Sequence, residues 1–166
     1  MAEPPIVKRS FAPVVRDDAR LLILGSLPGE ASLSAGRYYA HPRNQFWQLT
    51  GALIAHDLPA MAYEVRLAAL TEARIALWDM VASGERKGSL DGAIRVAALN
   101  DLTGLIGSLP HLQAIAFNGA KAAALGRRAL GKGLEVQCLT LPSSSPAYTM
   151  PLAAKAEAWL QLRPFL

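Results

Sequence analysis

Cysteine is almost absent from this chain of 166 residues, in which Cys138 is the single one. One cysteine forms no internal disulfide and supplies no cysteine-based metal cluster. The three histidines, His41, His56 and His111, have no metal-ligand spacing with one another. We therefore expect a protein that uses no metal and no other cofactor, in a compartment such as the cytoplasm.

Long hydrophobic runs are also absent. Apolar residues make up 52% of the chain, but no run approaches the roughly 18 residues that a membrane helix needs. The N-terminus lacks the unbroken apolar core of a secretory signal. We expect a soluble, cytoplasmic monomer with no membrane partner. Its length predicts one domain over residues 1–166, with residues 1–20 packed on it as an N-terminal extension.

The first half of the chain has no excess of either charge, so the net charge of +4 arises in the second half. Residues 1–83 carry eight basic and eight acidic side chains, whereas residues 84–166 carry nine and five. This asymmetry favours a polyanionic partner such as nucleic acid, although basic domains without such a partner also show it.

Short, continuous apolar runs predict strands that are covered on both faces. They lie at residues 21–24, 75–78, 114–117 and 136–141. Helices are expected over residues 44–54, 61–73, 101–108, 120–130 and 152–162, and residues 83–89 are expected to form a connection. Strands that alternate with helices predict the α/β class, here a three-layer α/β/α fold with a mostly parallel four-stranded central sheet.

Ligands of such sheets bind at the carboxyl ends of the strands. This rule directs attention to residues 25–29, 79–81, 118–119 and 142–148. The first segment, GSLPG, offers glycines and backbone amides that suit an anion or a water, or it is a plain turn. The aromatic segment YAHPRNQFW (residues 39–47) leads into a helix; Asn44 can be an ordinary N-cap, and Phe46 and Trp47 can be core residues.

Two further segments offer contacts for phosphate. The loop PSSSPAY (residues 142–148) presents small hydroxyl side chains that suit phosphate oxygens, or it is simply a flexible serine loop. The segment GRRALGKG (residues 126–133) nearly matches a P-loop, but Gly133 replaces the Ser or Thr and a helix precedes it. A basic helix end formed by Arg127, Arg128 and Lys132 is the better interpretation, and it too can contact phosphates.

Taken in order, these segments resemble the uracil-DNA glycosylase superfamily from residue 21 to the last helix. Segment 25–29 is similar to its first motif, and segment 39–47 is similar to an aromatic-A-H-P-x-N-x-F-W motif. Residues 78–81, 88–91, 117–119 and 141–145 resemble later segments. Leu27 stands where several branches place a catalytic Asn or Asp, and the combination is most similar to the hypoxanthine-DNA (deoxyinosine) glycosylase branch.

The resemblance implies roles for individual residues. Asn44 is the expected catalytic side chain, Tyr39 stacks on the flipped base, and Leu27 and Trp78 exclude water, although Trp78 can equally be a core residue. Asp79 reads the ring N–H of the base, or it serves as an N-cap or in a salt bridge. The expected base-binding residues are Gly25, Ser26, Leu27, Tyr39 and Asp79, and the expected DNA-binding residues are Gly29, Ser143, Ser144, Ser145, Pro146 and Ala147.

The implied activity is that of a monofunctional DNA glycosylase, which flips a deaminated base out of DNA and leaves an abasic site. Hypoxanthine is the first expected substrate and uracil the second. A covalent lysine intermediate is not expected, because Lys121 and Lys132 are placed on the far helix of the sheet or at its end. The alternative, suggested by Leu27, is a catalytically weak module that binds DNA lesions or nucleotides.

Overall fold

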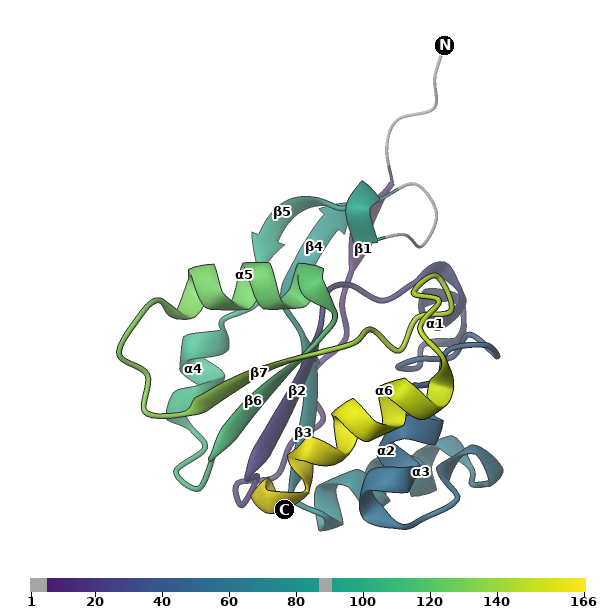
Figure 1. Ribbon diagram of the computed structural model, residues 1–166. Helices are drawn as coiled ribbons and strands as arrows, with labels where there is room; N and C mark the ends of the chain where they lie inside the picture. Colours follow the sequence, from purple (N-terminus) through teal and green to yellow (C-terminus); the bar gives the residue numbers. More distant parts are fainter. Residues whose placement is uncertain (1–5, 87–90) are drawn as a thin grey trace.

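The computed structural model describes residues 6–86 and 91–166, and a four-stranded sheet forms its centre (Figure 1). Its strands are β2 (Leu21–Gly25), β3 (Ile75–Asp79), β6 (Ala114–Asn118) and β7 (Gln137–Leu141). They lie in the order β3-β2-β6-β7, and every neighbouring pair is parallel. All four predicted strands are confirmed to within one residue at each end.

Helices cover both faces of this sheet, which confirms the three-layer α/β/α class. Leu21 and Ile23 of β2 pack with the cluster that includes α2 (Phe46–Ile54), α3 (Tyr63–Glu72) and α6 (Leu152–Trp159). Leu22 and Leu24 pack with the cluster on the other face, where α4 (Leu102–Gly107) and α5 (Ala120–Leu130) lie. All four β2 side chains are fully buried, which explains why the run is continuously apolar.

The five expected helices are present as α2 to α6. Helix α2 begins two residues later than expected, and α6 ends at Trp159, after which a 3-10 helix covers Leu160–Phe165. Helix α1 (Glu30–Ala35) was not predicted. Its six residues, EASLSA, offer too few apolar positions to produce a helical period, and Gly36 ends it in a left-handed conformation.

A second, antiparallel sheet was also not predicted. It consists of β1 (Val7–Arg9), β4 (Val81–Glu85) and β5 (Arg95–Leu99), in the order β1-β4-β5. The expectation of a connection over residues 83–89 is therefore wrong for 83–85, which belong to β4; residues 87–89 lie outside the described ranges. Strand β4 contains Ser83 and Gly84 and so shows no continuous apolar run. Strand β5 (RVAAL) does contain a run of four apolar residues, but it is exposed throughout and was not recognised as a strand.

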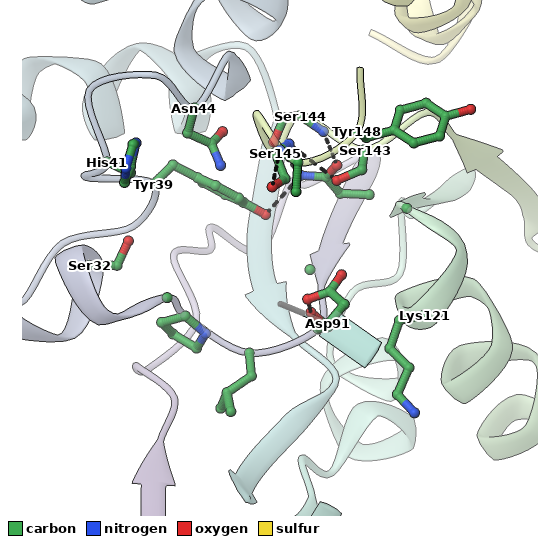
Figure 2. A pocket seen from close by; sticks show the side chains of 18 of the residues that line it. Ser32, Tyr39, His41, Asn44, Asp91, Lys121, Ser143, Ser144, Ser145 and Tyr148 are labelled. Atoms are coloured by element: carbon green, nitrogen blue, oxygen red, sulfur yellow. Dashed lines mark hydrogen bonds between the residues drawn. The ribbon is translucent and has the colours of Figure 1, made fainter. Parts of the chain in front are cut away.

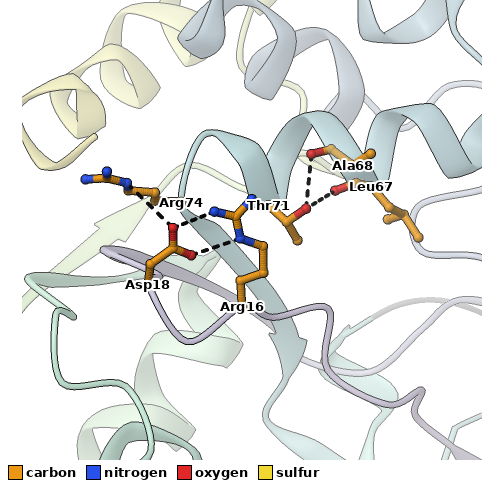
Figure 3. A network of polar contacts seen from close by, with 6 residues as sticks. All are labelled: Arg16, Asp18, Leu67, Ala68, Thr71 and Arg74. Atoms are coloured by element: carbon orange, nitrogen blue, oxygen red, sulfur yellow. Dashed lines mark hydrogen bonds and ion pairs between the residues drawn. The ribbon is translucent and has the colours of Figure 1, made fainter.

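After β1, the chain passes the β3 edge of the central sheet at Val14. Val14 and Leu77 exchange two backbone hydrogen bonds of 2.9 Å each. At the amino ends of the strands, Arg16 and Arg74 both pair with the Asp18 carboxylate (Figure 3). The hydrogen bond from Arg16 lowers the pKa of Asp18. This network lies at the opposite end of the sheet from the strand ends that the sequence singled out.

The elements also show how the P-loop-like segment folds. Gly126 lies inside α5, so the P-loop-like segment does not form the turn between a strand and a helix that cradles phosphate. Within the described residues, none of the helices is both long and apolar enough to cross a membrane.

Candidate active site

A cavity of about 730 Å³ opens at the carboxyl ends of the parallel strands (Figure 2). Gly25 ends β2, Asp79 ends β3 and Asn118 ends β6, and the loop after β7 completes the wall. The position agrees with the rule for ligand sites in α/β sheets. All twelve expected site residues line it: Gly25, Ser26, Leu27, Gly29, Tyr39, Asn44, Asp79, Ser143, Ser144, Ser145, Pro146 and Ala147.

Asn44 lies one residue before the N-cap of α2, which is Gln45, so the N-cap interpretation is off by one residue and the catalytic role stays a prediction. Its Oδ1 atom accepts a hydrogen bond of 3.0 Å from the backbone N–H of Phe46, the first residue of α2. Its Nδ2 group makes no hydrogen bond to any other part of the described chain, and Figure 2 shows the amide at the cavity. The helix-start contact thus fixes the orientation of the carboxamide and leaves a donor facing the cavity.

Tyr39 is held as a flat wall of the cavity. Its ring stacks on the buried ring of Phe46 with 3.9 Å between centroids and 14° between planes. Its hydroxyl accepts a hydrogen bond of 3.2 Å from Asn118 Nδ2. Burial raises the pKa of this hydroxyl, so it keeps its proton. The backbone φ of 51° at Tyr39 is unusual for an aromatic residue, and the surrounding contacts maintain it.

Gly25 leaves room for two of these side chains. A Cβ atom at this position would lie 2.5 Å from Asp79 Oδ1 and 2.7 Å from the Tyr39 hydroxyl. Only a residue without a side chain lets both groups approach the end of β2.

We expect Gly25→Ala to lower the free energy of unfolding by about 1–3 kcal/mol, because Asp79 or Tyr39 must move. Urea unfolding measures the change. Gly107→Ala is the matched control, since a Cβ atom there meets nothing within 4 Å. Equal stability of the Gly25→Ala variant and the wild type would contradict the close approach.

Asp79 lies at the base of the cavity with 4% of its surface exposed. Its Oδ2 atom is buried and has no hydrogen-bond partner, and Asp79 forms no ion pair among the described residues. Burial, together with the nearby charge of Asp91, raises the pKa of Asp79 to about 7, although Arg86 opposes the shift. The structure therefore supports neither the N-cap nor the salt-bridge alternative, and it leaves a carboxyl oxygen for a ligand.

Two residues that were not expected at the site, Arg86 and Asp91, hold the segment 25–29 in place. Ser26 Oγ donates a hydrogen bond of 2.6 Å to Asp91 Oδ1, and Arg86 forms an ion pair of 3.6 Å with the same oxygen. The guanidinium also donates to the carbonyl oxygens of Leu27 and Pro28. Asp91 ends segment 88–91, whose resemblance to the superfamily was the one sequence signal that could have indicated a role for Asp91. Residues 88–90 of that segment lie outside the described ranges.

Asn118 connects the loop after β7 to the aromatic wall. Its Nδ2 donates to Ser144 Oγ at 2.9 Å as well as to Tyr39, and its Oδ1 accepts from the Ser144 backbone N–H at 2.9 Å. Gly119, with a φ of +97°, lets Ser143 approach closely. The serine loop is therefore ordered by specific contacts, and the flexible-loop alternative does not hold for Ser144.

Two expectations about surrounding residues need correction. Trp78 does not line the cavity; its indole N–H donates to the Phe11 carbonyl oxygen, so the core alternative is the supported one. Lys121, expected to lie away from the site, lines the cavity, with its ammonium turned away from Asn44 in Figure 2. Arg127 and Lys132 lie near the other end of α5, on the order of 10–15 Å further along the helix axis, and do not line the cavity; their contact with phosphates stays a prediction.

A parallel α/β/α sandwich whose strand ends enclose an amide donor, a stacked aromatic ring and a buried carboxyl group suits an enzyme that binds a single planar nucleobase. The sequence model of the Uracil DNA glycosylase superfamily matches residues 12–163. The chain therefore belongs to the uracil-DNA glycosylase superfamily, a group of DNA glycosylases, and the resemblance drawn from its ordered motifs is confirmed.

Individual relatives agree with this assignment. A protein named hypoxanthine DNA glycosylase from Methanosarcina acetivorans is 42% identical over 142 residues, which are 86% of this chain and 89% of the relative. A protein of the same name from Methanosarcina barkeri (strain Fusaro) is 36% identical over 93% of this chain and 96% of its own. A solution NMR structure of a candidate uracil DNA glycosylase from M. acetivorans superposes with a TM-score of 0.85 at 38% identity, covering 96% of this chain and 99% of that one.

Proposed function

We propose that this protein removes hypoxanthine from DNA by hydrolysing its N-glycosidic bond, and that it leaves an abasic site. The observation that carries the proposal is the free Nδ2 donor of Asn44 at the cavity. The two relatives named hypoxanthine DNA glycosylase support the choice of base. The partner is then DNA that contains deaminated bases, and we expect the protein to act on it as a cytoplasmic monomer.

Cleavage of the glycosidic bond produces a cationic sugar and an anionic base, so the site needs to stabilise separated charge. Asn44 Nδ2 is placed to donate to the departing base or to hold the attacking water. Such a donor is effective because its direction is fixed before the reaction and because the surrounding site has a low dielectric.

Base recognition follows from the walls of the cavity. Phe46 covers one face of the Tyr39 ring, and we propose that the other face stacks on the flipped base. Asp79 accepts from the ring N–H of hypoxanthine, and the apolar Leu27 excludes water. Adenine presents a ring acceptor where hypoxanthine has its N–H and is disfavoured. Uracil also offers a ring N–H beside a carbonyl, so it fits the same contacts and is the second substrate.

Of the expected backbone contacts, we propose that Gly29, Ser143 and Ser145 meet the DNA, whereas the buried Ser144 holds the loop through Asn118. Pro146 and Ala147, both exposed at the cavity rim, are placed to enter the space that the flipped base vacates. A flipped nucleotide would thus have its base near Asn44 and its phosphates near the serine loop.

Oligonucleotides that carry one deoxyinosine, deoxyuridine or deoxyadenosine test the activity directly. After incubation and alkali, we expect strand cleavage at deoxyinosine, weaker cleavage at deoxyuridine and none at deoxyadenosine. Retained binding to deoxyinosine DNA with no cleavage at enzyme excess would overturn the proposal in favour of a lesion-binding module.

Borohydride treatment during the reaction tests the monofunctional mechanism. Because the Lys121 ammonium is turned away from Asn44, we expect no covalent protein–DNA adduct. An adduct that disappears in Lys121→Met would establish a lysine intermediate instead.

A further inference from the structure

Lys155 of α6 is a buried lysine, with 1% of its surface exposed. Lysines are almost never fully buried unless they are paired, because removing the ammonium from water costs free energy. Lys155 forms no ion pair with a carboxylate among the described residues. Burial accordingly lowers the pKa of its ammonium. Such a group needs compensation from hydrogen bonds, and its neighbours show where that compensation comes from.

The ammonium contacts two segments that come from different parts of the chain, the start of α2 and the serine loop after β7. The Lys155 ammonium donates a hydrogen bond of 2.9 Å to Oε1 of Gln45, the residue directly after Asn44. It donates a second one of 3.2 Å to the backbone oxygen of Ser145. It also lies 5.5 Å from the ring centroid of Tyr148, within the range of a cation–π contact. An ammonium has three donor positions, and the hydrogen bonds to Gln45 and Ser145 use two of them.

The same two segments also meet through their backbones. The Gln45 N–H donates to the Ser144 carbonyl oxygen at 3.0 Å. Below this contact, the Trp159 indole N–H of α6 donates to the Pro142 carbonyl oxygen at 3.0 Å. Helix α6 therefore contacts the loop after β7 through Trp159 and Lys155. Lys155 also contacts the start of α2 through Gln45.

We propose that Lys155 is a positioning residue whose ammonium fixes the separation between Asn44 and the serine loop. This inference rests on the proposed function. In a flipped nucleotide the covalent geometry of the DNA sets the distance between base and phosphate, so the two protein segments must be held at a matching distance. A misplacement of about 1 Å at a reacting centre can lower a rate by about a hundredfold.

The test is Lys155→Met, which keeps an unbranched side chain but removes the charge and the donors. We expect the single-turnover rate of hypoxanthine release, at saturating enzyme, to fall by about 10- to 100-fold. Arg163→Met removes one exposed positive charge in the 3-10 helix after α6. This control should react at the wild-type rate. A wild-type rate in Lys155→Met would overturn the proposal.

A second variant separates positioning from simple loss of stability. Gln45→Met removes the acceptor on the α2 side and should lower the rate in the same direction. If the two residues act through one contact, the double variant should be no slower than Lys155→Met alone. A double variant whose losses multiply would show that the contact does not transmit the effect.

Amide hydrogen exchange gives a measurement that does not depend on catalysis. We expect faster exchange of the Gln45 N–H in Lys155→Met, with unchanged exchange at the centre of β2. If the wild type released no hypoxanthine, the proposed function would be wrong. The exchange rate of the Gln45 N–H would still show whether Lys155 positions this segment. Unchanged exchange at Gln45 would count against Lys155 in either case.

Discussion

Asn44→Ala is expected to lower the single-turnover rate of hypoxanthine release by about 10²- to 10³-fold, the usual cost of removing one fixed donor from a site of developing charge. Asn44 Nδ2 is the donor in question, because Oδ1 is already engaged by the Phe46 N–H. The alanine variant also loses this helix-start contact and should be less stable by about 1 kcal/mol. Quench-flow or manual sampling at enzyme excess, with alkali to reveal abasic sites, measures the rate.

Asn44→Asp separates the chemistry from the helix contact. A carboxylate of the same size still accepts from the Phe46 N–H, but it has no N–H to donate and it repels an anionic base. We expect this variant to be as stable as the wild type and as inactive as Asn44→Ala. Full activity in either variant would show that another group carries out the catalytic role.

Asp79→Asn is expected to change how stability depends on pH. The pKa of Asp79 is about 7 in the folded protein and near the ordinary value of 3.8 for an aspartate when unfolded. Between these values the folded state binds the extra proton, so the contribution of Asp79 to stability is greatest below about pH 4 and is lost as the pH rises to 7. The loss across this window is roughly 2–4 kcal/mol.

Urea unfolding of both proteins at several pH values between 4 and 8 measures this contribution as a difference. The stability of the wild type relative to Asp79→Asn should fall as the pH rises toward 7 and remain constant above it. Because every other titrating group is shared, the difference isolates Asp79. A difference that stays constant from pH 4 to 8 would contradict a raised pKa, and one that grows with pH would contradict its direction.

The central sheet could be predicted from the sequence because burial on both faces requires continuous apolar residues, as in Leu21–Gly25. The antiparallel sheet could not, because Ser83 and Gly84 interrupt β4, and because the short apolar run of β5 is exposed in the fold instead of buried on both faces. Strand pairing stabilises these segments, and it depends on partners distant in the chain. Helix α1 is similarly too short and too polar to show a period.

The candidate site divides in the same way. The residues at strand ends, such as Gly25 and Asp79, could be located from the rule for parallel sheets. Arg86 and Lys155 could not, because each acts through a contact that is distant in the chain. Arg86 lies 59 residues from Leu27, and Lys155 lies 110 residues from Gln45. No local pattern distinguishes a buried lysine in an amphipathic helix from an exposed one.

The two bonds that Asn118 donates, to Tyr39 and to Ser144, have a consequence for the selection of damage. They join the two walls of the cavity in a single rigid frame before any DNA arrives, so little ordering free energy is spent on binding. The main energetic barrier to engagement then lies in the DNA, in the few kcal/mol needed to unpair and unstack the base. Such an enzyme engages bases whose pairing and stacking free energy is low. A lesion in a weakly paired context should therefore be excised faster than the same lesion in a stably paired one.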